Sequence, residues 1–184
     1  MPTIQQCIVR VNASPGLNTD ECHATTQVVS RALSGLAIGQ CADGTLDSFK
    51  AELARVANTT ESRVYRIDVE QFGHSFAVAQ SGGKVVVMQS WVGCYSLHDW
   101  MRGEVEDLKK NTFLPIKGET EHSVLSWYLD VISQDLRAGN IDNVYKYGLA
   151  LFNPLPPRTT TMRMALGYAR GNALSLKWAS RAIP

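Results

Sequence analysis

The stretch HSFAVAQSGGKVVVMQSWV, residues 74–92, decides the fold of this 184-residue chain. Two strand-like runs, 74–80 and 84–92, flank Ser81-Gly82-Gly83, and such a Gly-Gly pair is a strong signal for a β-hairpin. Just upstream, apolar and charged residues alternate over 63–70, which is the pattern of a half-buried strand. We therefore expect an antiparallel sheet of at least three strands in the middle of the chain.

Helices are predicted on the N-terminal side of this sheet. Asn18, with Glu21 three residues later, forms a capping box, so a helix should begin there and end near Ser34. Cys22 then lies in its first turn. A second helix is expected over 45–58, because apolar residues recur there at helical spacing. Before these helices, residues 4–11 form a short run that favours a strand.

The part of the chain after residue 95 has mostly helical patterns. We expect helices over about 96–110, 121–138, 141–152 and 160–181, with a proline-rich break at 153–157. These elements predict an α+β fold in which an N-terminal helix carrying a cysteine packs on the antiparallel sheet. The expected organisation is one domain, 1–184, with a core over about 15–95 and a helical C-terminal portion over about 96–184.

Composition excludes several function classes. The 18 Lys and Arg nearly balance the 17 Asp and Glu, so no global field draws the chain to nucleic acid or to an anionic membrane. The four cysteines are widely spaced without a CxxC pair, which argues against a metal site, and nothing in the sequence calls for a cofactor. Free thiols are the simpler interpretation, with a Cys7–Cys41 disulfide as the alternative.

The beginning of the sequence does not have the pattern of a signal peptide, and no window approaches the length of an apolar membrane span. We therefore expect a protein that is made in the cytoplasm. Delivery by a specialised secretion machine is compatible with this expectation, because it leaves no such mark in the sequence.

Three residues form the candidate catalytic set. A helix N-terminus stabilises a thiolate, so Cys22 stands where a cysteine nucleophile gains reactivity. His74 opens an apolar strand and can serve as the base for a neighbouring thiol. Gln89 lies in the apolar return strand, where a buried amide needs a partner such as an imidazole N–H.

The length of the hairpin loop tests this set. If the loop is the four residues 80–83, then His74 falls opposite Gln89 on the same face of the sheet. A two-residue Gly82-Gly83 loop would instead pair His74 with Trp91. The sequence leaves both registers open.

The order of these motifs resembles the papain-like cysteine enzymes. The matching segments are Asp20-Glu21-Cys22-His23, Gly73-His74-Ser75-Phe76 and Gln89-Ser90-Trp91. The separation of 52 residues between the cysteine and the histidine is more like that of the compact bacterial branches, which include effector and toxin proteases, glutamine deamidases and cell-wall amidases. This resemblance covers roughly residues 15–95.

The sequence also departs from the papain-like pattern near the cysteine. Papain-type proteases carry a Gln shortly before the cysteine that helps to bind the oxyanion, and this chain has none between Gln6 and Cys22. Asn18 is one candidate for that role, and the backbone N–H of Cys22 is another. Asp99, 25 positions after His74, is an alternative to Gln89 as the orienting residue.

The implied function is acyl transfer through a thioester. His74 would take the Cys22 proton, and the thiolate would attack an amide of a protein substrate. The leading hypothesis is therefore a bacterial effector or toxin that deamidates a glutamine or cleaves a peptide bond, with a cognate immunity protein or chaperone as a compatible partner. The rival hypotheses are a peptidoglycan amidase and a binding or immunity module without catalysis.

Overall fold

A computed structural model describes residues 2–16, 22–89, 93–96, 120–140 and 171–184. Its helices and strands follow one another along the chain as α1 (Ile4–Asn12), α2 (Cys22–Ser34), α3 (Leu46–Val56), β1 (Arg63–Val69), the 3-10 turn η1 (Glu70–Phe72), β2 (His74–Ser81), β3 (Lys84–Gln89), β4 (Gly93–Ser96), α5 (Glu121–Ala138) and β5 (Leu176–Ala182).

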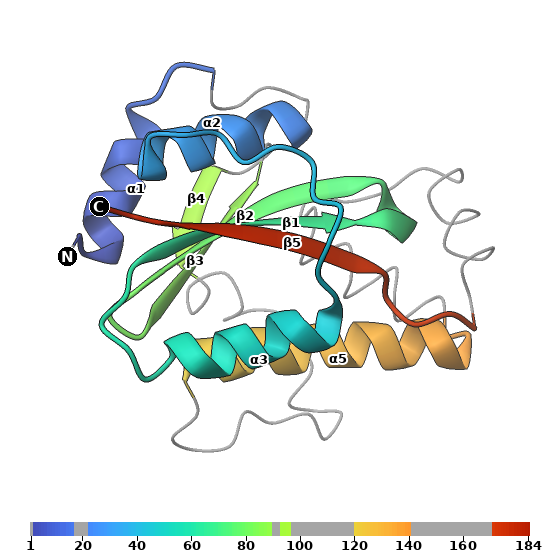
Figure 1. Cartoon of the computed structure of the whole chain (residues 1–184). Coiled ribbons are helices and arrows are strands. Elements are labelled where there is room, and N and C mark those ends of the chain that lie inside the picture. The colour runs from blue at the N-terminus through green and yellow to red at the C-terminus, as the bar shows by residue number, and fades with distance from the viewer. Residues whose placement is uncertain (1, 17–21, 90–92, 97–119, 141–170) are drawn as a thin grey trace.

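The strands form one sheet in the order β4-β3-β2-β1-β5, and each neighbouring pair is antiparallel. Figure 1 shows that α1 and α2 cover one face of this sheet and that α3 and α5 cover the other. We call these the α2 face and the α5 face. The expected α+β class, with a Cys22 helix packed on an antiparallel sheet, is confirmed.

Strand alternation assigns each sheet residue to one of the two faces. On β1, Tyr65, Ile67 and Val69 belong to a buried cluster with α3 and α5, whereas Val64 belongs to a second cluster with α1 and α2. On β2, Phe76 and Val78 join the first cluster, and Ala77 and Ala79 join the second. The small side chains of β2 therefore lie under α2, where they allow the helix to approach the sheet closely.

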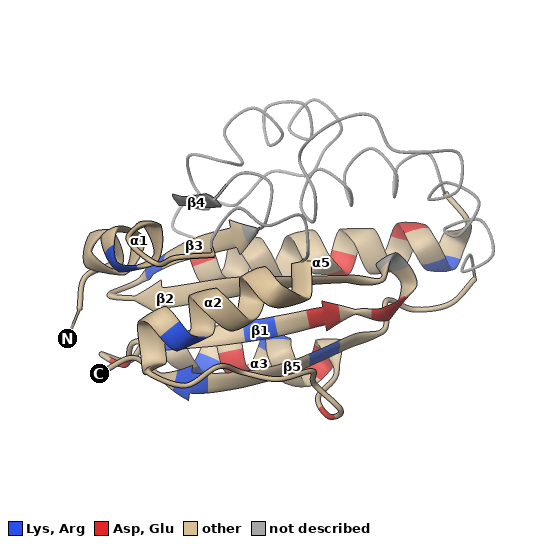
Figure 2. Cartoon of the chain, turned by 90° about the horizontal axis from the view of Figure 1, so that it is seen from above, with Lys and Arg blue, Asp and Glu red and all other residues tan. Residues whose placement is uncertain are grey.

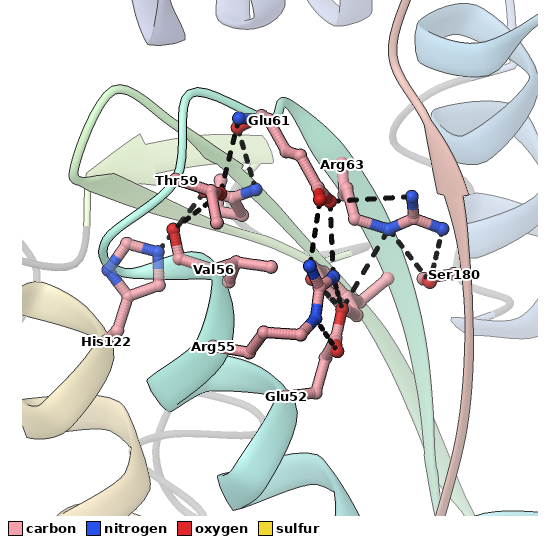
Figure 3. Close-up of polar contacts among 10 residues, drawn as sticks. Glu52, Arg55, Val56, Thr59, Glu61, Arg63, His122 and Ser180 are labelled. Atoms are coloured by element: carbon pink, nitrogen blue, oxygen red, sulfur yellow. Dashed lines mark hydrogen bonds and ion pairs between the residues drawn. The ribbon is translucent and has the colours of Figure 1, made fainter.

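An ion-pair network ties the end of α3 to the sheet (Figure 3). The Arg55 guanidinium donates to both carboxylate oxygens of Glu52, at 2.8 and 2.7 Å, and also to Glu61. Arg63, the first residue of β1, donates to the hydroxyl of Ser180 on the neighbouring strand β5. Figure 2 shows that β1 and α5 carry charges of both signs, whereas α1 and α2 carry only positive charge.

The structure confirms several expected elements. The helix predicted to end near Ser34 is α2, the helix over 45–58 is α3, and the strand over 63–70 is β1. The expectation that this strand is half-buried is wrong, because β1 is buried on both faces of the sheet. The helix over 121–138 is α5, with the same bounds. Residues 97–110 and 141–152, where two further helices are predicted, lie outside the described residues, and Ser96 is the last residue of the strand β4.

The N-terminal strand prediction is wrong, because residues 4–12 form the helix α1. Thr3 and Gln6 make a capping box, and the buried Cys7 and Val11 are four positions apart on one stripe. The run of β-prone residues concealed this helical spacing. The buried clusters therefore extend beyond residues 15–95 on the N-terminal side.

The end of the predicted helix over 160–181 is also wrong. Gly171 has a φ of 87°, and the residues that follow it form β5, which pairs with β1. Leu176 and Trp178 pack with the cluster on the α5 face, and Trp178 is therefore not on a helix. Since β5 is a strand, the C-terminal portion is not wholly helical.

Candidate functional site

Cys22 is the first residue of α2 and is half-buried. The buried Thr26, Val29 and Leu33 follow it at helical spacing, so Cys22 belongs to the stripe of α2 that faces the sheet. The first N–H groups of a helix have no partner within the helix, and they favour negative charge. The capping residues proposed for this end, Asn18 and Glu21, lie outside the described residues.

His74 is the first residue of β2, directly after Gly73, whose φ of 55° ends the η1 turn. The backbone of His74 pairs with Val69, which ends β1. Its ring stacks on Phe76, with the ring centroids 6.2 Å apart and the planes inclined by 16°. His74 therefore starts on the α5 face of the strand, and Cys22 belongs to the helix on the other face.

The chain neighbours of these two residues are in direct contact. His23 Nδ1 lies 2.7 Å from Ser75 Oγ, which joins the first turn of α2 to the start of β2. Cys22 and His74 are each one position from this contact, so the structure brings them to the same corner of the molecule. Because β2 begins at His74, the side chains of Cys22 and His74 can meet only around this end of the sheet.

The hairpin has the two-residue loop, so the register with His74 opposite Gln89 is wrong. Ser81 pairs with Lys84, and Ala77 pairs with Met88. Gly82 and Gly83 have φ of 56° and 80°, values that suit a tight turn, and glycine adopts them without strain. Continued toward its open end, this register puts position 89 opposite position 76.

Gln89 is the last residue of β3, and its backbone pairs with Gly93 of β4. Positions 74 and 89 still fall on the same face of the sheet, because positions 74 and 76 are two residues apart on one strand. They are diagonal neighbours instead of directly opposed ones. Cross-strand diagonal positions remain within reach of long side chains.

A polar cluster that residue spacing alone does not predict lies beside Cys22 on the α2 face. Arg66, Asp68 and Ser75 are its buried members, Cys41 is half-buried, and His23 is exposed. Arg66 is only 1% exposed, and its Nε donates to Asp68 Oδ1 at 3.1 Å. Asp68 also accepts a hydrogen bond from the Ser75 hydroxyl and one of 2.8 Å from the Cys41 amide.

This cluster shifts the protonation of two of its members. Burial alone would raise the pKa of Asp68, but the hydrogen bonds from Ser75, from the Cys41 amide and from Arg66 outweigh it and hold the pKa below its ordinary value. Burial, followed by the charge of Asp68, raises the pKa of the Cys41 thiol to about 12. Cys41 is therefore a protonated thiol near neutral pH.

Comparisons with known proteins give one structural likeness. No protein-family model matches the sequence, and no curated protein matches it either. The fold is similar to the crystal structure of CHBP, a Cif homologue from Burkholderia pseudomallei, with a TM-score of 0.49 and 13% sequence identity. The likeness covers 90% of this chain and 64% of the CHBP chain, so it spans less than two thirds of that protein.

The remaining predicted site residues are only partly placed. Asp99 lies outside the described residues, as do Ser90 and Trp91. Cys7, Cys22 and Cys41 are free thiols, so the alternative Cys7–Cys41 disulfide is absent from the described part of the chain. None of the described helices is long and apolar enough to cross a membrane.

Proposed function

We propose that this chain is a cysteine-dependent acyl-transfer enzyme that acts on an amide of a protein substrate. Cys22 is the nucleophile, His74 is the general base, and Gln89 orients the imidazole. The 2.7 Å contact between His23 and Ser75 is the observation that carries the proposal, because it places the first turn of α2 against the start of β2.

The chemistry follows from these roles. His74 accepts the proton from Cys22 Sγ, and the sulfur attacks the carbonyl carbon of the amide to form a tetrahedral intermediate. The imidazolium returns the proton to the leaving nitrogen, the C–N bond breaks, and a thioester remains. Water, deprotonated by His74, then attacks the thioester and releases a carboxylic acid and the free thiol. The backbone N–H of Cys22 is available for the oxyanion.

The substrate amide distinguishes two outcomes. If it is a glutamine side chain, ammonia leaves and the product is glutamate, whereas attack on a peptide bond cuts the target chain. We propose an effector or toxin that is made in the cytoplasm and delivered to a cell containing its target protein. Deamidation or proteolysis of that target is the proposed activity.

The first test measures the reactivity of Cys22. Wild-type protein is treated with iodoacetamide near neutral pH, and alkylation of each cysteine is followed by peptide mass spectrometry. Cys22 should react at least tenfold faster than free cysteine at the same pH, because the N-terminus of a helix favours the thiolate. A rate at Cys22 no higher than that of free cysteine would contradict the proposal.

The second test separates a catalytic histidine from a packed one. His74→Phe keeps an aromatic ring against Phe76 but cannot accept a proton, so the fold should survive. Loss of a general base lowers turnover by roughly 100-fold to 10,000-fold. A fully active His74→Phe variant would remove His74 from the mechanism.

The third test identifies the reaction. Extracts of target cells are incubated with wild type or with Cys22→Ala, and the proteins are analysed by mass spectrometry. A gain of about one dalton at a glutamine indicates deamidation, and new termini indicate proteolysis, each through the thioester route. Products that also form with Cys22→Ala would contradict the role of Cys22, as would the complete absence of modified proteins.

A further inference from the structure

The donors of Arg66 are distributed among three different segments. Its Nε binds Asp68, its Nη1 donates to the backbone oxygen of Ile38 at 3.0 Å, and its Nη2 lies 2.9 Å from His23 Nδ1. Asp68 balances its charge at the centre of the cluster. The guanidinium therefore links β1, the segment after α2 and the first turn of α2.

The contact with Arg66 defines the proton position on His23. A guanidinium has only N–H donors, so Nδ1 of His23 must accept from Arg66 Nη2, and the proton of the neutral ring lies on Nε2. Ser75 Oγ lies 2.7 Å from the same nitrogen, but its one proton goes to Asp68, so it supplies no hydrogen bond to Nδ1. Arg66 Nη2 is therefore the donor that holds Nδ1.

We propose that His23 is a positioning residue: Arg66 holds its Nδ1, and this hydrogen bond fixes the first turn of α2, and with it Cys22, at the start of β2. The part that concerns Cys22 rests on the proposed function. The anchoring of the helix does not, because it follows from the cluster alone.

Two substitutions at His23 separate anchoring from chemistry. In His23→Asn, the amide oxygen stands near the place of Nδ1 and can accept from Arg66, but nothing replaces Nε2. His23→Ala removes both the acceptor for Arg66 and the Nε2 group. His23 is exposed, so neither change opens a cavity in the core.

Hydrogen exchange at the amides of residues 26–28 measures the anchoring directly. These amides bond to carbonyls of the first turn, so they report whether that turn is closed. Exchange should be about tenfold faster in His23→Ala, the effect of losing one hydrogen bond to a charged group. In His23→Asn it should stay within about twofold of wild type. Wild-type exchange in His23→Ala would overturn the proposal, and so would equal acceleration in both variants.

Alkylation of Cys22 by iodoacetamide gives the second readout on the same proteins. The rate at Cys22 should fall in His23→Ala and recover in His23→Asn. An equal fall in both variants with unchanged exchange would make His23 a chemical participant and overturn its positioning role. If exchange responds as expected but wild-type Cys22 reacts no faster than free cysteine, the anchoring stands and the proposed function fails.

Discussion

His122 is a histidine that the fold holds in its neutral form. It is 1% exposed on α5, and its Nε2 lies 3.3 Å from the side-chain oxygen of Gln80. The amide nitrogen of Gln80 donates to the Glu61 carbonyl, so its oxygen faces the ring, and the ring proton lies on Nε2. Within the described chain, His122 Nδ1 has no hydrogen-bond partner. Burial lowers the pKa of His122.

This lowered pKa makes the free energy of unfolding depend on pH. The histidine ring of the unfolded chain has a pKa of about 6.5. Below that pH the unfolded state binds a proton that the folded state does not bind, so the free energy of unfolding falls. From pH 7.5 to 5.5, wild type should lose up to about 1 kcal/mol more than His122→Gln, which keeps a donor for Gln80. Urea unfolding at the two pH values measures the difference. Equal losses in both proteins would show that His122 titrates normally.

The burial of Arg66 and Asp68 shows what a residue pattern leaves undetermined. Alternation along β1 assigns both residues to the side opposite Tyr65, and the sequence predicts that assignment correctly. It does not reveal that α2 covers this side, because the pattern carries no information on which helix packs there. The location of Cys22 at a helix start was predictable, since it depends only on nearby residues.

At the scale of elements, local signals were sufficient where one pattern dominated. The apolar residues at helical spacing predicted α2 and α3 correctly, and the alternation of apolar and charged residues predicted the strand β1. The sequence of β5 also alternates, but its short pattern follows a long helix-prone stretch, and only pairing with β1 decides the strand. The Gly82-Gly83 turn fixed the hairpin register, which motif order alone could not do.

Gly44 allows β5 to lie against the segment before α3. Its φ is 88°, and a Cβ there would come within 2.7 Å of Cδ1 and 2.9 Å of Nε1 of Trp178. The indole is held in place, because its Nε1 donates to Ser48 at 2.8 Å and its backbone N–H donates to Asp43. The close approach therefore requires a glycine.

We expect Gly44→Ala to destabilise the protein by about 2–4 kcal/mol, the sum of an unfavourable φ and an overpacked contact. Gly35→Ala is the matched control, because Gly35 has a φ of 86° with no atom within 4 Å of the added Cβ. It should cost only about 1 kcal/mol. Thermal unfolding compares the two, and equal losses would mean that Trp178 yields to the methyl group.

At the scale of the whole molecule, one sheet separates two buried clusters. β5 contributes to both, because Leu176 lies in the cluster on the α5 face and Ala179 packs against the cluster on the α2 face. Ile183, the residue after β5, is also a member of the cluster on the α2 face. The sheet hydrogen bonds are common to the two sides. Loss of packing on one face should therefore weaken the strands that support the other.

Ile183→Ala tests whether the two clusters unfold together. Ile183 is 5% exposed, and its truncation should lower the free energy of unfolding by about 2–4 kcal/mol. In urea, tryptophan fluorescence, including that of Trp178 on the α5 face, and alkylation of the buried Cys7 on the α2 face should shift to the same lower midpoint. Leu36→Ala, at a residue that is 61% exposed, should leave both midpoints unchanged. The two midpoints should move together because a shared sheet cannot lose one side and keep the other intact. A shift of the Cys7 midpoint alone would show that the two faces are separate folding units.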